Sequence, residues 1–152
     1  MEQIERGYTY HDEKKYELAI KEFSEAIKLQ PNNPGIYGLR GYVYKDRGQE
    51  SQSVEDYDLA IADFTKSIEL TPTAAAHCAR GILYGYKGNR EAALVEYNIA
   101  IQIDPNFSET YLHRGVWYGA NNDFNKAIAD WEKVLQINPD NYAAKALLDR
   151  VR

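Results

Sequence analysis

Apolar residues of this 152-residue chain recur three and four positions apart in four separate stretches, each typical of one face of a helix. The first stretch comprises Ala19, Ile20, Phe23, Ala26 and Ile27. The later ones comprise Leu59, Ala60, Ile61, Phe64 and Ile68; Ala93, Leu94, Tyr97 and Ile101; and Ala127, Ile128, Trp131, Val134 and Leu135. A proline follows each stretch, and proline does not continue a helix. The pattern therefore predicts four amphipathic helices.

The string Arg-Gly-x-x-Tyr precedes each of these helices. Its glycines are Gly7, Gly41, Gly81 and Gly115, which are 34, 40 and 34 residues apart. The apolar pattern continues through each glycine, so we predict a second helix in every unit rather than a helix break. Glycine inside a helix costs about 1 kcal/mol relative to alanine. We therefore expect each glycine to lie where its helix approaches the following one closely, opposite the small residues Ala19, Ala60, Ala93 and Ala127.

The recurring signature resembles that of the tetratricopeptide repeat family, as in Gly7, Tyr10, Ala19, Phe23 and Pro31. The likeness covers residues 2–141, and a short helix over 141–151 follows it. The resemblance implies an all-α fold, an α-solenoid of antiparallel helix hairpins. In the final helix, Tyr142, Ala143, Ala146 and Leu147 are expected to cover the last repeat.

We interpret residues 1–152 as a single domain of four repeats and a capping helix. The repeats are predicted over 1–33, 34–73, 74–107 and 108–141. The second repeat is longer: Gly41 and Ala60 are 19 residues apart, whereas the equivalent residues of the other repeats are 12 apart. The seven additional residues fall within 48–56. Their polar and acidic composition predicts an exposed loop that partly extends the flanking helices, with Ser53 as an N-cap.

An arginine precedes each glycine, and a carboxylate precedes each aromatic residue of the following helix. The arginines are Arg6, Arg40, Arg80 and Arg114, and the carboxylates are Glu22, Asp63, Glu96 and Asp130. Their common register predicts an ion pair across every hairpin. The alternative is that the arginine stems cover apolar surface while the charged ends stay in water.

Composition and charge exclude several functions. A net charge of −5 without a basic run argues against nucleic acid or an anionic membrane as the partner. Neither a signal peptide pattern nor an apolar stretch of spanning length is present, so we expect no membrane insertion and a cytoplasmic location. Cys78 and His113 lack a third ligand, so no metal is expected. No catalytic motif or phosphate-binding loop appears, so we expect neither a cofactor nor an enzyme.

The first helix of each unit has a second face, which we expect to bind a partner. In the resembling family this face lines a concave groove for peptides or helices. The predicted groove residues are Tyr8, Leu39, Tyr42, Ile82, Tyr86, Leu112, His113 and Val116. An apolar, tyrosine-rich surface suits protein recognition. The alternative is that some of these residues pack between neighbouring helices.

The sequence therefore predicts a non-catalytic module that binds a peptide or helix of another protein. Some relatives hold the C-terminal carboxylate of chaperones with Lys, Asn, Asn, Lys and Arg. Neither matching register of this chain, beginning at Ile4 or Gly38, provides such a set. The alternative function is a self-associating scaffold whose repeat faces form homo-oligomers.

Overall fold

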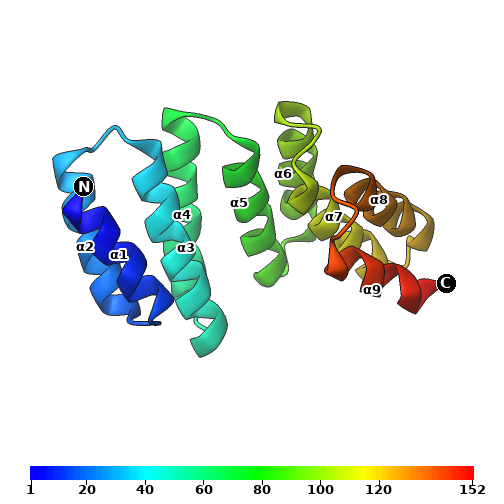
Figure 1. Cartoon of the computed structure of the whole chain (residues 1–152), viewed down its shortest axis with the longest axis horizontal. Coiled ribbons are helices and arrows are strands. Elements are labelled where there is room, and N and C mark those ends of the chain that lie inside the picture. The colour runs from blue at the N-terminus through cyan, green and yellow to red at the C-terminus, as the bar shows by residue number, and fades with distance from the viewer. The chain divides into compact units, whose positions relative to one another are not determined.

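A computed structural model describes all residues, 1–152, and contains nine helices and no strand. The helices are α1 (Glu2–Asp12), α2 (Tyr16–Leu29), α3 (Pro34–Ser51), α4 (Val54–Leu70), α5 (Ala74–Tyr86), α6 (Arg90–Ile103), α7 (Ser108–Ala120), α8 (Phe124–Ile137) and α9 (Tyr142–Val151). They form four hairpins followed by one terminal helix, which confirms the predicted all-α fold (Figure 1). No helix is both long enough and apolar enough to cross a bilayer.

The chain divides into two compact units, Met1–Pro72 and Thr73–Arg152. The first contains α1–α4, in which α2 contacts both α1 and α3. The second contains α5–α9, in which α7 contacts α5, α6 and α8, and α9 covers α8. The assignment of both units to a single domain stays a prediction.

Turn chemistry sets the helix boundaries. Each second helix of a hairpin ends two residues before its proline, as α2 does at Leu29 before Pro31. After many of the turns, a side-chain oxygen caps the amino end of the next helix. Thr73 at α5 and Asn89 at α6 are examples. These oxygens accept hydrogen bonds from backbone amides that a helix leaves unpaired, which stabilises its first turn.

Each of the four motif glycines lies against an aromatic ring of the partner helix. The rings belong to Phe23, Phe64, Tyr97 and Trp131. A Cβ on Gly81 would lie 2.8 Å from Cε1 of Tyr97, and one on Gly7 would lie 2.6 Å from Cε1 of Phe23. The close approach is therefore as predicted, but the nearest atoms are those of the ring rather than of the small residue one turn earlier. The absence of a side chain makes room for the ring.

The predicted ion pairs are present in all four hairpins. The arginine Nη2 atoms lie 2.9, 2.7, 2.6 and 2.8 Å from the carboxylates of Glu22, Asp63, Glu96 and Asp130. Arg40 and Arg114 also donate through Nε, so both hold their aspartate with two hydrogen bonds. Bidentate geometry is among the stronger forms of this interaction. The alternative, arginine ends free in water, is therefore wrong.

Burial changes the acidity of one of these carboxyls. It raises the pKa of Asp63 above the ordinary value of 3.8, although the hydrogen bond from Arg40 acts in the opposite direction. A raised folded-state pKa contributes stability that is complete below the unfolded value and is lost as the pH rises through the folded value. Asp123 differs, because a hydrogen bond from Lys126 lowers its pKa.

We expect carboxyl carbon NMR to show Asp63 titrating above pH 3.8 and Asp123 titrating below it. Arg40→Gln should raise the Asp63 midpoint further, because it removes the group that favours the charged form. It should leave the Asp123 midpoint unchanged. An Asp63 midpoint below that of Asp123 would contradict this account of the hairpin.

The predicted loop at 48–56 is mostly helical, and this corrects the sequence interpretation. The additional residues lengthen α3 and α4, and only Gln52 and Ser53 separate the two helices. Ser53 caps α4 as predicted, since its Oγ accepts a hydrogen bond from the amide of Asp56 at 3.3 Å. Gly48 and Asp56 were expected to be exposed but are buried. Asp56 accepts two hydrogen bonds from Arg47, which explains its burial.

Deletion of residues 49–55 is expected to leave a folded, helical chain. Each deleted side chain is exposed or half-buried, and a shorter connection lowers the entropy cost of closing the hairpin. The deletion also joins Gly48 to Asp56, a Gly-Asp turn like Gly88-Asn89 of the third hairpin. Circular dichroism and a cooperative thermal transition test this expectation. Loss of the transition would show that the longer helices are essential to the first unit.

The terminal helix α9 covers α8 with a different face from the one expected. Ala144 and Leu148 are its buried residues, whereas Tyr142 is 82% exposed. Leu147 packs at the edge of the same cluster. The predicted face was therefore displaced by about one residue, because alanines on several sides of this helix give the apolar pattern little direction.

Candidate protein-binding pocket

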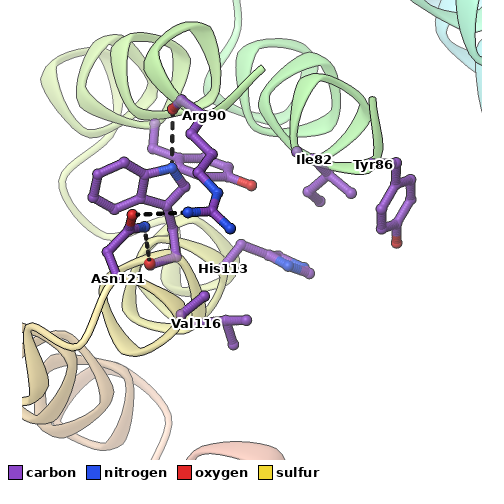
Figure 2. A pocket seen from close by; sticks show the side chains of 10 residues that line it. Ile82, Tyr86, Arg90, His113, Val116 and Asn121 are labelled. Carbon is purple, nitrogen blue, oxygen red and sulfur yellow. Dashed lines mark hydrogen bonds between the residues drawn. The ribbon is translucent and has the colours of Figure 1, made fainter. Parts of the chain in front are cut away.

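A pocket of about 270 Å³ opens in the second unit between α5, α6 and α7. Its lining consists of Ile82, Gly85, Tyr86, Arg90, Tyr97, His113, Val116, Trp117, Ala120 and Asn121. Figure 2 shows the labelled side chains around this space, with Ile82 and Tyr86 extending from one helix and His113 and Val116 from another. The lining is mostly aromatic and aliphatic, and it contains no carboxylate.

Four predicted groove residues meet in this pocket: Ile82, Tyr86, His113 and Val116. Tyr86 and Val116 are each 45% exposed, so both present apolar surface to water. Ile82 is 7% exposed and forms the floor, where it packs with Tyr97 and the single cysteine, Cys78. Burial raises the pKa of the Tyr97 phenol, which therefore stays protonated.

The other predicted groove residues lie elsewhere. Leu112 is half-buried against the cluster of α7, α8 and α9, and it does not line the pocket. Leu39 similarly packs against the core of the first unit. These two residues therefore pack between neighbouring helices, which was the alternative to a place in the groove. Their side chains complete the core rather than the pocket.

Tyr8 and Tyr42 belong to the first unit, and their rings contact the partner helix. Tyr8 meets Phe23 edge-on with ring centroids 5.9 Å apart, and Tyr42 meets Phe64 with centroids 5.0 Å apart. Both were predicted to lie on the partner-binding face of the first helix, and these ring contacts show that they also pack against the second helix. Tyr8 remains 48% exposed, and Lys45 lies over the Tyr42 ring at 5.3 Å.

Three polar residues of the lining escaped the sequence prediction. Trp117 Nε1 donates a hydrogen bond to the Arg90 carbonyl at 2.9 Å, and Asn121 Nδ2 donates one to the Trp117 carbonyl at 2.7 Å. The first bond fastens the start of α6 to α7 and holds the indole in place, and the second lies within the last turn of α7 (Figure 2). Arg90 and Asn121 lie at the edges of turns, where the sequence gives no periodic pattern to place them.

The histidines do not form a metal centre. His77 Nδ1 lies 2.8 Å from Glu96, His11 Nε2 lies 2.8 Å from Asp46, and His113 Nε2 lies 3.8 Å from Glu109. Each histidine thus has one carboxylate beside it, on separate parts of the chain. No group of three or more His, Cys, Asp or Glu side chains is arranged to hold an ion.

The paired helices and their glycine–ring contacts define a helical-repeat protein. Models of the tetratricopeptide repeat match residues 7–48, 74–107 and 108–141, which together span most of the chain. The chain belongs to the tetratricopeptide repeat family. Repeats of this family generally mediate protein–protein interaction, and the fold is generally a non-catalytic interaction module.

Several solved structures share the fold. A thermophilic TPR protein of Thermus thermophilus superposes with a TM-score of 0.84 at 16% identity, over 95% of this chain and 76% of that one. The MamA protein gives a TM-score of 0.74 at 23% identity, over 97% and 83%. YrrB, a TPR protein with an unusual peptide-binding site, gives 0.74 at 22% identity, over 94% and 71%. A search of curated proteins found no significant match.

Proposed function

We propose that this chain binds a peptide or helical segment of another protein, and that the pocket of the second unit receives one large apolar side chain of that partner. The observation that carries the proposal is the concave lining with the exposed groups of Tyr86 and Val116. A side chain that enters would remove these groups from water, which is the main favourable term in such association.

The pocket has room for one large side chain. Its volume of about 270 Å³ lies near the lower end of the range for small-ligand sites, about 300–1,000 Å³, and it is open on one side. The hydrogen bond that Trp117 makes with α6 fixes one wall before any partner arrives. A preformed wall lowers the ordering cost of binding. The peptide-binding site of YrrB, a protein of the same fold, is compatible with this role.

Selection from a library of blocked twelve-residue peptides tests the proposal. We expect enrichment of peptides with a large aliphatic or aromatic residue. A selected peptide should shift the indole NMR signal of Trp117, which lines the pocket, and leave that of Trp131, which is 3% exposed in the core. Trp117→Phe assigns the two signals. Selected peptides that leave the Trp117 signal unchanged would place binding elsewhere and overturn the proposal.

Light scattering separates peptide binding from the self-associating scaffold. We expect the mass of one chain, 17.4 kDa, at the concentrations used for selection. A larger mass, together with loss of peptide binding as the oligomer forms, would favour the scaffold.

A further inference from the structure

Arg90 differs from the motif arginines in its electrostatic surroundings. Arg6, Arg40, Arg80 and Arg114 each hold a carboxylate of their own hairpin. The Arg90 side chain instead donates only to the amide oxygen of Asn121, at 3.4 Å, and is exposed at the rim of the pocket. Its positive charge is therefore not balanced by a carboxylate of this chain.

The pocket beside Arg90 has no acidic side chain in its lining, since no Asp or Glu is part of it. The second basic group of the lining, His113, has Glu109 at 3.8 Å one turn earlier on α7. Figure 2 shows the Arg90 side chain extending toward Asn121, and both residues line the pocket together with His113 and Val116. An apolar surface and an unpaired guanidinium thus lie side by side.

We propose that the partner segment carries an Asp or Glu side chain next to its apolar anchor, so that the anchor enters the pocket while the carboxylate binds Arg90. This inference rests on the proposed function. The planar guanidinium suits a carboxylate, because it can donate two parallel hydrogen bonds. Trp117 holds the Arg90 backbone through a 2.9 Å hydrogen bond. The Arg90 side chain therefore extends from a fixed position beside the anchor site.

The net charge of the chain makes a preference for acidic peptides unexpected unless a local group causes it. At −5, the molecule as a whole repels acidic peptides. Preference for an acidic residue therefore requires a local cause, and Arg90 provides one at the edge of the pocket.

The test compares selections from the same blocked peptide library with three forms of the chain: unchanged, Arg90→Gln, and the control Arg150→Gln. Arg150 is an exposed arginine of α9 outside the pocket, so its replacement changes the net charge equally. We expect the unchanged chain and Arg150→Gln to select apolar anchors with a neighbouring Asp or Glu. Arg90→Gln should select the same anchors without the acidic residue, and should bind the acidic peptides about two- to fivefold more weakly.

Four results would overturn the inference. Anchors without acidic neighbours in the unchanged chain would show that Arg90 recognises nothing, while leaving the proposed function intact. An acidic preference that survives Arg90→Gln would place the cause elsewhere. Selection only from a second library with free C-terminal carboxylates would show that Arg90 binds the chain end rather than a side chain. If no apolar anchor is selected at all, the proposed function fails, and this inference fails with it.

Discussion

Alanine at both Tyr42 and Tyr86 is expected to abolish capture of a partner peptide while the helical content stays nearly unchanged. Both tyrosines lie on first helices of their hairpins, and Tyr86 contributes exposed ring surface to the pocket. Truncation of a buried aromatic anchor commonly costs about 2 kcal/mol or more of binding free energy. Titration calorimetry with a selected peptide, and circular dichroism of the variant, provide the two measurements.

The single variants Tyr42→Ala and Tyr86→Ala show which of the two units binds the peptide. Tyr86→Ala should cause most of the loss if the pocket of the second unit is the anchor site, because Tyr42 belongs to the first unit. Tyr42→Ala also removes an edge-on contact with Phe64, so its thermal transition must be measured beside its affinity. Tyr142→Ala is the matched control, since that tyrosine is 82% exposed on α9 and does not line the pocket. Normal binding by the double variant would refute the groove hypothesis.

Leucine at Gly81 is expected to destabilise the second unit by about 1–3 kcal/mol, which is typical of overpacked helix contacts. A Cβ at this position would lie 2.8 Å from Tyr97 Cε1 and 3.1 Å from Glu96 Cβ. Neither neighbour is free to move, because Tyr97 is 4% exposed and Glu96 binds Arg80 and His77. Urea denaturation monitored by circular dichroism measures the loss.

Gly85 provides the control for Gly81, because it lies one turn later on the same helix with no atom within 4 Å of an added Cβ. Alanine at Gly85 should stabilise α5 by up to about 1 kcal/mol, through helix propensity alone. If the Gly81→Leu variant is as stable as the parent chain, close approach of the helices does not explain the repeated glycine.

The repeated signature was sufficient to predict the hairpins, since the same glycine and ring recur at one register in every unit. The lengthening of α3 and α4 was predicted only in part, because most of residues 48–56 was interpreted as a loop. Their polar composition suits an exposed helix as well as a loop, and only the tertiary pairing of Arg47 with Asp56 distinguishes the two.

The candidate site was predictable only along the first helices. Ile82, Tyr86, His113 and Val116 follow from helical spacing, and the structure places all four around one pocket. Arg90 and Asn121 lie at the edges of turns, so their approach depends on how neighbouring hairpins pack. Leu39 and Leu112 have the same apolar character as true lining residues, and small differences of helix rotation direct them into the core.

The buried Cys78 gives the second unit an intrinsic kinetic probe. It is the single cysteine of the chain and is 1% exposed, so a thiol reagent reaches it only when α5 separates from its neighbours. The rate of thiol modification therefore reports how often this helix opens, without any introduced label. A peptide seated above Ile82, which packs in the same cluster, should slow the modification because it binds only the closed unit.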